Sequence, residues 1–284
     1  MSHRGIGTLG AALLALACAA PAQAQFGAWS QPTALDAVNS PKRDGCPFPS
    51  PDGLRLYIAS DRGEGGDLDI WVSERADPGA PWGPPVELPE PINSPQDDFC
   101  PSPGHGGRFM FVSKRPGGCG LGDIYRTRYV NGGWLTPQNL GCEINSEFEE
   151  AGPVRAFGSL YFSSNRVANQ YDIYASPAFG PWIGRPHPVT ELNTPVTDDA
   201  RPFVRADGRE IVFDSTRPGG LGSDIWSATR PHPWARWSTP VNLTAINSAA
   251  AETRPSLSPD GRTLYFGSTR GTSQDVFTST RNRP

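Results

Sequence analysis

Short apolar runs of strand length recur along the chain, each bounded by residues typical of turns. Residues 263–267 are β-branched, aromatic or apolar, a composition that favours a strand. They follow Ser258-Pro259-Asp260-Gly261, in which Pro presets one φ and Gly accepts a positive one. Residues 109–112 are apolar without a break, which is typical of a strand covered on both faces. The pattern predicts an all-β chain of short strands and tight turns.

The strands belong to a repeat of about 50 residues. The Arg that closes the second strand of each unit recurs at steps of 51 to 53 residues, as Arg62, Arg115, Arg166, Arg217 and Arg270. The Pro in the first strand recurs as Pro47, Pro101, Pro153, Pro202 and Pro255. The Asp that opens the third strand recurs as Asp69, Asp123, Asp172, Asp224 and Asp275. Several short strands per unit at this period are typical of a β-propeller.

A second repeated segment, here called the Trp–Asn segment, predicts how the ring closes. It starts with Trp and reaches Asn ten or eleven residues later, beginning at Trp29, Trp82, Trp134, Trp182 and Trp237. The segment follows the first four units and is missing after the fifth, whereas one copy stands before the first unit. Residues 29–37 should therefore form the outer strand of the blade built from residues 252–281, which removes the open edges. We predict one domain over residues 25–284, a five-bladed β-propeller of four-stranded antiparallel blades closed by the N-terminal strand.

Residues shared by every blade are interpreted as fold residues, because repeats share what stacking requires. The five Trp side chains should be buried. The repeated Arg and the repeated Asp of the third strand should hold the loop between them by charge-assisted hydrogen bonds.

Two phrases resemble a known repeat family. RPSLSPDGRTLYFGSTR ends at Arg270 and RPGGLGSDIW runs from Arg217 to Trp226; both resemble the WD40-like β-propeller repeats of TolB-type periplasmic proteins. The resemblance covers about residues 29–281. It implies a propeller with a periplasmic or cell-surface binding role. The propeller of TolB itself has six blades, whereas five are counted here.

The N-terminus has the pattern of a secretory signal peptide. Arg4 is followed by an apolar core and by Ala22-Gln23-Ala24, so residues 1–24 should be removed by cleavage after Ala24. Cys18 offers a lipoprotein alternative. The formal net charge of −4 and the lack of a basic run argue against nucleic acid as a partner. No later stretch is apolar for long enough to span a bilayer. We expect a monomer in the periplasm or outside the cell.

Four cysteines remain after cleavage into an oxidising compartment, and they allow three pairings. Cys119 and Cys142 fall in loops on one face of the second blade, which favours a disulfide between them. Cys46 and Cys100 then remain as neighbours on adjacent inner strands, a second candidate pair. No Cys or His spacing of a metal site occurs.

The candidate ligand-binding residues lie where the inner strands begin. A carboxylate precedes each inner strand: Asp44, Asp98, Glu150, Asp199 and Glu252. These five should ring one mouth of the axial channel. They could accept hydrogen bonds from the incoming loop, bind a ligand or cation, or act as the paired acids of a glycosidase. Two positions later the blades differ, and Arg201 and Arg254 stand there in the fourth and fifth blades. These two Arg could bind an anion, or they could pair with the acidic ring.

Other chemistry is weakly indicated. The acidic loop 61–69 contains several carboxylates but does not follow the EF-hand spacing. No Gly-x-Ser-x-Gly nucleophile motif occurs. We therefore predict no catalytic residue, no metal and no cofactor. The predicted function is non-catalytic binding of an envelope protein or of a glycan or peptide ligand at the axial mouth. The alternative is a glycosidase-like enzyme that uses the axial carboxylates.

Overall fold

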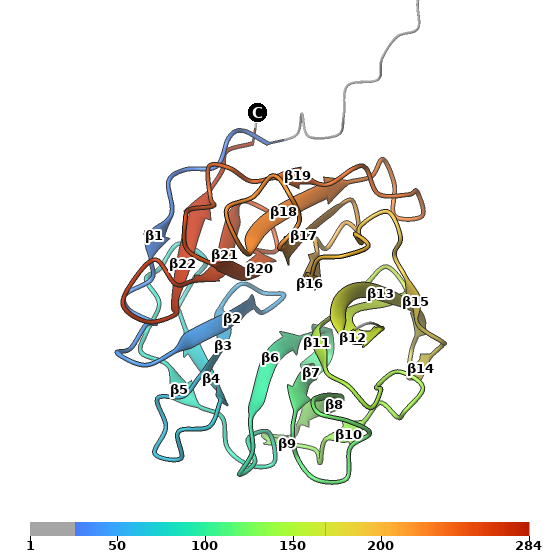
Figure 1. The fold of residues 1–284 in the computed structure, drawn as a ribbon. Coiled ribbons are helices and arrows are strands. Elements are labelled where there is room, and N and C mark those ends of the chain that lie inside the picture. The colour runs from blue at the N-terminus through green and yellow to red at the C-terminus, as the bar shows by residue number, and fades with distance from the viewer. Residues whose placement is uncertain (1–25, 168, 284) are drawn as a thin grey trace, which may run out of the picture.

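The computed structural model describes residues 26–167 and 169–283, in which almost all regular structure is β-strand. Five small antiparallel sheets form a ring, with one strand of each at the centre (Figure 1). The all-β, five-bladed propeller predicted from the sequence is thus confirmed. The predicted signal peptide, its cleavage point after Ala24 and Cys18 lie outside the described residues. Nowhere in 26–167 and 169–283 is there a helix of the length and apolarity that crossing a membrane requires.

Each blade is described from its inner to its outer strand. The first has β2 (Asp44–Pro49), β3 (Arg55–Ser60), β4 (Asp69–Glu74) and β5 (Val86–Glu87). The second has β6 (Asp98–Pro103), β7 (Arg108–Ser113), β8 (Asp123–Val130), β9 (Gly133–Trp134) and β10 (Gln138–Asn139), with the 3-10 turn η2 (His105–Gly107). The third has β11 (Glu150–Ala156), β12 (Ser159–Val167), β13 (Gln170–Phe179), β14 (Trp182–Ile183) and β15 (His187–Pro188). The fourth has β16 (Asp199–Val204), β17 (Glu210–Ser215), β18 (Asp224–Thr229) and β19 (Val241–Asn242). The fifth has β20 (Glu252–Leu257), β21 (Thr263–Ser268), β22 (Asp275–Thr280) and the N-terminal β1 (Thr33–Ala34).

The N-terminal strand closes the ring as the displaced Trp–Asn segment predicts. β1 pairs with β22, with Thr33 opposite Thr278 and Ala34 opposite Phe277 (Figure 1). The pairing extends beyond the strands, because the Gly27 N–H donates to the Asn282 carbonyl at 2.7 Å. The two ends of the described chain are therefore joined side by side.

The Asn of each Trp–Asn segment explains why that segment repeats. Asn145 accepts a hydrogen bond from the Ile124 N–H at 2.9 Å and donates to the Ile124 carbonyl at 3.2 Å. The amide side chain thus replaces a missing strand partner at the outer edge of β8. The same two-way contact is made by Asn39, Asn93, Asn193 and Asn247.

One position of every inner strand is a β-bulge. The register between the first and second strands shifts there in all five blades, and the next residue is the repeated Pro, which has no N–H to donate to the ladder. The bulged residue has φ between 48° and 58° in each blade, as Cys46, Cys100, Gly152, Arg201 and Arg254. This left-handed conformation re-aims one side chain per blade.

The expected burial of the five Trp side chains is wrong for one of them. Trp82 and Trp237 are buried, and Trp29 and Trp134 are partly buried, but Trp182 is 57% exposed. The buried pair lie under guanidinium groups, with Arg75 4.1 Å from the Trp82 ring centre and Arg230 3.9 Å from that of Trp237. Within the described residues neither Trp134 nor Trp182 has such a contact, and the third blade has Ala178 at the place of the Arg.

Candidate functional site

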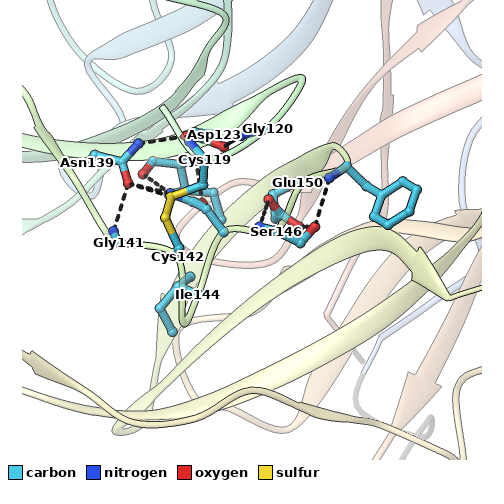
Figure 2. The surroundings of a disulfide bond; sticks show 12 residues. Cys119, Gly120, Asp123, Asn139, Gly141, Cys142, Ile144, Ser146 and Glu150 are labelled. Carbon is cyan, nitrogen blue, oxygen red and sulfur yellow. Dashed lines mark hydrogen bonds between the residues drawn. A yellow bond between two sulfur atoms is a disulfide. The ribbon is translucent and has the colours of Figure 1, made fainter. Parts of the chain in front are cut away.

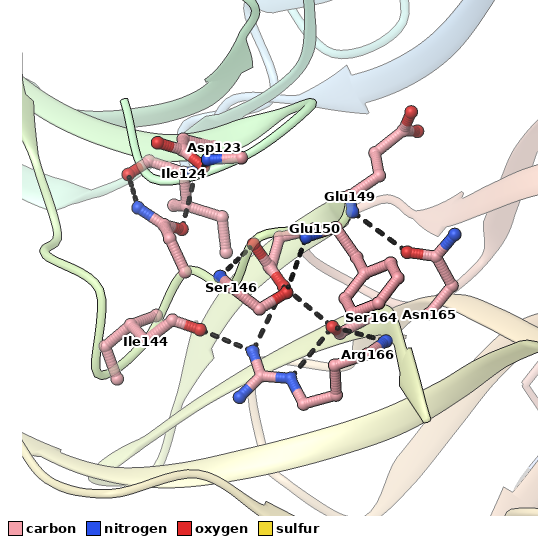
Figure 3. A network of polar contacts seen from close by, with 12 residues as sticks. Asp123, Ile124, Ile144, Ser146, Glu149, Glu150, Ser164, Asn165 and Arg166 are labelled. Carbon is pink, nitrogen blue, oxygen red and sulfur yellow. Dashed lines mark hydrogen bonds and ion pairs between the residues drawn. The ribbon is translucent and has the colours of Figure 1, made fainter. Parts of the chain in front are cut away.

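A buried ion pair holds the start of each inner strand. In Figure 3 the carboxylate of Glu150 accepts hydrogen bonds from the Ser146 N–H at 2.8 Å, from the Ser164 hydroxyl at 2.7 Å and from Arg166 at 3.1 Å. Arg166 also donates to the carbonyl of Ile144 in the preceding Trp–Asn segment. The corresponding pairs of the other blades are Arg62–Asp44, Arg115–Asp98, Arg217–Asp199 and Arg270–Glu252.

These pairs bear on two expectations. The side chains of Asp44, Asp98, Glu150, Asp199 and Glu252 have no exposed surface. Their oxygens accept hydrogen bonds from the incoming loop and from the repeated Arg, so they offer no open ring of carboxylates to a ligand. The expected hydrogen bonds of the third-strand Asp to its loop are present, since Asp123 accepts from the Gly120 N–H at 3.2 Å and Asp224 from the Leu221 N–H at 3.0 Å. The repeated Arg donates to the inner-strand carboxylate rather than to the loop.

The bulged residues do face the channel. Together with the five repeated Pro, they line an axial cavity of about 30 Å³. Cys46 and Cys100 are joined there by a disulfide, which links the inner strands of the first and second blades. Gly152 leaves room for its neighbour, since a Cβ on it would lie 2.7 Å from the Arg201 Cα. The remaining two positions carry Arg201 and Arg254.

Arg201 has a partner that its repeat position does not suggest. Its guanidinium contacts both carboxylate oxygens of Asp214, at 2.9 and 3.1 Å. Asp214 lies on the second strand of the same blade, where the other blades have Ala59, Val112, Ser163 and Gly267. The alternative in which Arg201 pairs with the acidic ring is therefore wrong. An Asp at a position otherwise small or apolar was the signal that could have identified this pair.

Arg254 has no carboxylate partner for its guanidinium within residues 26–167 and 169–283. The backbone N–H of Arg254 donates to Asp214 at 2.8 Å. The guanidinium makes one long contact of 3.5 Å with the Thr253 hydroxyl. Burial and the neighbouring charge of Arg201 lower the pKa of Arg254 to about 10. The group is still cationic at neutral pH, but its charge is incompletely compensated.

Two further residues join this cluster and were not predicted. The Tyr171 hydroxyl donates to Glu149 at 2.8 Å, and the Arg201 guanidinium lies 5.7 Å from the centre of the Tyr171 ring. Burial and the charge of Glu149 raise the pKa of Tyr171 well above its usual range. We call Glu149, Tyr171, Arg201, Asp214 and Arg254 the axial cluster.

The second disulfide braces the outer part of the second blade. Figure 2 shows Cys119 joined to Cys142, with an S–S distance of 2.06 Å. The Cys119 N–H donates to Asp123, and Asn139 donates to the same carboxylate at 2.7 Å. This pairing connects the loop before β8 with the loop after β10, the two loops that the sequence places on one face.

The first blade departs from this arrangement in its acidic loop. Asn139 and Asn242 donate to Asp123 and Asp224 in the second and fourth blades, but the corresponding residue of the first blade is Glu87, beside Asp69. Burial, with the charges of Asp67 and Glu87, raises the pKa of Asp69 to about 7. In the described part of the chain, no three His, Cys, Asp or Glu side chains converge as metal ligands.

We expect Glu87→Asn to stabilise the protein at pH 8. The pKa of folded Asp69 lies above its ordinary value near 3.8, so the folded state binds more protons, and stability falls as pH rises from about 4 to about 7. The substitution would remove one repelling charge and add a hydrogen-bond donor, a gain of roughly 1–3 kcal/mol. Urea unfolding at pH 8 and at pH 4 measures this. The gain should shrink at pH 4, and Glu64→Gln, in the same exposed loop, should have little effect. An equal gain at both pH values would contradict the account.

Comparisons with known proteins identify the fold. No family model matches the chain, and no curated protein matches its sequence. A TolB-like protein from Agrobacterium tumefaciens is 19% identical over 85% of this chain and 78% of its own, with a TM-score of 0.50. An arabinanase from Bacillus subtilis is 11% identical, with a TM-score of 0.57 over 88% of this chain and 97% of its own. An α-L-arabinofuranosidase from Lactobacillus brevis is 13% identical, with a TM-score of 0.55 over 88% and 94%. At these identities the likeness is one of fold.

Proposed function

We propose that this protein is a non-catalytic binding protein that holds an anionic group of its ligand at the axial mouth. One observation carries the proposal: Arg254 is a partly buried cation beside Arg201, without a carboxylate for its guanidinium among the described residues. Burying a charge costs free energy unless it is paired. A ligand anion would supply the missing partner.

The chemistry of the site favours a carboxylate. An Arg guanidinium presents planar N–H donors that match a carboxylate with two hydrogen bonds. The axial cavity of about 30 Å³ has the scale of one water molecule. It admits one small group of a ligand rather than a whole sugar ring or side chain. A ligand with a terminal carboxylate, such as a peptide end or an acidic sugar, would place that group by Arg254 and the rest outside the mouth.

The glycosidase alternative has less support. Two free carboxylates flanking a substrate are required for that chemistry. The five inner-strand carboxylates are buried and paired with Arg. Asp214 and Glu149 are each occupied by a partner, at 2.9 Å from Arg201 and 2.8 Å from Tyr171. The propeller shared with an arabinanase and an arabinofuranosidase hosts many unrelated functions.

The setting that fits this proposal is the periplasm or the extracellular space. Two disulfides are typical of oxidising compartments. The repeats resemble the WD40-like repeats of TolB-type periplasmic proteins, which fits this setting. We expect the protein to be a monomer that binds a component of the cell envelope.

Arg254→Met should abolish carboxylate binding and leave the fold intact. N-acetylglycine, titrated calorimetrically into the mature protein, should bind the wild type, whereas the uncharged N-acetylglycinamide should not. Met fills the volume without the charge, and no carboxylate of the described residues loses an ion pair. The Tm of the variant should therefore match or exceed that of the wild type.

Arg201→Met is the matched control for a structural role. It leaves Asp214 without its guanidinium partner, which should cost about 3–5 kcal/mol of stability. A comparable loss of stability in Arg254→Met would assign Arg254 to the fold. Equal binding of the acid and the amide would show that no anion is recognised.

A further inference from the structure

Four blades close their inner hairpin in the same way at the face opposite the axial cluster. An Arg from the end of the third strand donates through Nε to the carbonyl of a hairpin glycine. The pairs are Arg75–Gly53 at 2.8 Å, Arg128–Gly106 at 2.9 Å, Arg230–Gly208 at 2.6 Å and Arg281–Gly261 at 2.8 Å. A contact that recurs in four blades belongs to the repeat rather than to one site.

The third blade has Ala178 where three of these blades have the Arg, and an aromatic surface lies beside it. Phe179 packs on Gly158, since a Cβ on that glycine would lie 2.7 Å from its ring. The Phe179 ring stacks beside Trp182, with centroids 6.3 Å apart and an angle of 9° between the planes. Phe179 is 64% exposed, Trp182 57% and Phe157, at the neighbouring hairpin tip, 45%. The Phe157 ring packs on Gly208 of the fourth blade, so Phe179 and Trp182 are the two stacked rings that this blade leaves open to solvent.

Two Arg side chains contact the backbone of the same tip, and a third, Arg108, lies close enough to act on one of them. Arg126 of β8 donates to the Pro181 carbonyl at 2.6 Å, and Arg155 of β11 donates to the Gly180 carbonyl at 3.0 Å. Burial, and then the charges of Arg108 and Arg126, lower the pKa of Arg155, as expected for neighbouring cations. None of the three forms an ion pair within the described part of the chain. In a chain of net charge −4, this is a local excess of positive charge.

We propose that Phe179, Trp182, Arg126 and Arg155, here called the third-blade tip, dock an acidic segment of a partner protein. Exposed apolar patches mark interaction sites, and aromatic residues with Arg are the types enriched at protein interfaces and their energetic centres. The uncompensated Arg charges require an acidic counterpart. The surface is separate from the axial cluster, so the proposal does not rest on carboxylate binding there.

The placement of the charges favours a protein over a lipid surface. Membrane-binding elements keep their cations behind an apolar edge, at the level of the head groups. Here Arg126 and Arg155 bond to the carbonyls of residues 181 and 180, between Phe179 and Trp182. A bilayer would have to accept guanidinium groups at the depth of the aromatic rings, which is costly.

A glutamate-rich random copolymer of Glu and Tyr tests the surface on the full mature protein. Fluorescence anisotropy of the labelled copolymer should report binding that weakens with added salt. Trp182→Ala and Arg155→Gln should each weaken it by about tenfold or more. Phe179→Ser, which removes the ring stacked beside Trp182, should also weaken binding while the Tm is kept.

Trp234 and Arg236 provide matched controls. Trp234 is 81% exposed and Arg236 is exposed, but both lie on the fourth blade, so Trp234→Ala and Arg236→Gln should bind like the wild type. The proposal is overturned if these variants lose as much affinity as the third-blade variants, or if the wild type does not bind the copolymer. It is also overturned if Trp182-dependent binding is seen only with phosphatidylglycerol vesicles, because the partner would then be a membrane.

Discussion

Deletion of residues 26–37 should lower the Tm by roughly 10 °C and make the protein aggregate. The deletion removes β1, the Gly27–Asn282 contact and the Leu35 N–H bond to the Val276 carbonyl at 2.9 Å. It also removes the Trp29 ring, 4.3 Å from the Arg281 guanidinium. These contacts together are worth several kcal/mol. β22 would become an open strand edge. Calorimetry and light scattering during heating measure both effects.

A circular permutant separates closure from simple loss of sequence. Residue 283 would be joined to residue 26 by a short Gly-Ser linker, and the chain would be opened between the exposed Pro41 and Lys42. The two ends already meet at Gly27 and Asn282. The permutant should melt near the wild-type temperature and stay monomeric. If the deletion variant were as stable as the permutant, β1 would not be what closes the ring.

Asp98→Asn should cost about 3–5 kcal/mol of unfolding free energy. The Asp98 side chain has no exposed surface and lies 2.9 Å from Arg115, whose side chain is only 16% exposed. Asn keeps the shape and removes the charge, so the guanidinium remains buried without its counter-ion. Urea unfolding with the disulfides intact gives the difference.

The control for this pair is an ion pair of the same chemistry on the surface. Arg185 and Glu143 are 2.7 Å apart, but their side chains are 88% and 59% exposed. Glu143→Gln should therefore cost no more than about 1 kcal/mol. The double variant Asp98→Asn/Arg115→Met should recover part of the loss, because it removes the unpaired charge as well. If Asp98→Asn and Glu143→Gln lost similar amounts of unfolding free energy, burial would not determine how much each ion pair stabilises the protein.

The ring and its closure could be predicted because they depend on residues that repeat. The displaced copy at Trp29 identified the strand that pairs with β22, since closure needs one outer strand for every blade. The partner of the repeated Arg was harder to predict from the sequence. Asp98 and Asp123 are both carboxylates near Arg115, and only the path of the folded chain decides that Asp98 receives the guanidinium.

The axial cluster and the third-blade tip are departures from the repeat, and sequence reasoning found them only in part. Arg201 and Arg254 stood out because their position varies between blades, but their surroundings did not. Asp214 and Tyr171 come from other strands and meet Arg201 through the register of β16 with β17 and the packing of two blades. Trp182 keeps the residue type of its repeat but is exposed, because Ala178 stands where three other blades have an Arg, a dependence that no single position reveals.

The left-handed bulges determine how the ligand specificity of the axial mouth can change. Four of the five bulged residues carry a side chain at φ near 50°, a conformation that costs a non-glycine residue about 1–2 kcal/mol. The repeated Pro and the strand register fix that backbone, whatever residue occupies it. Exchanging the side chain therefore changes the lining of the channel without moving the frame, and glycine is the substitution that relieves strain. Related propellers with the same backbone could therefore acquire different ligands by single substitutions at these bulged positions.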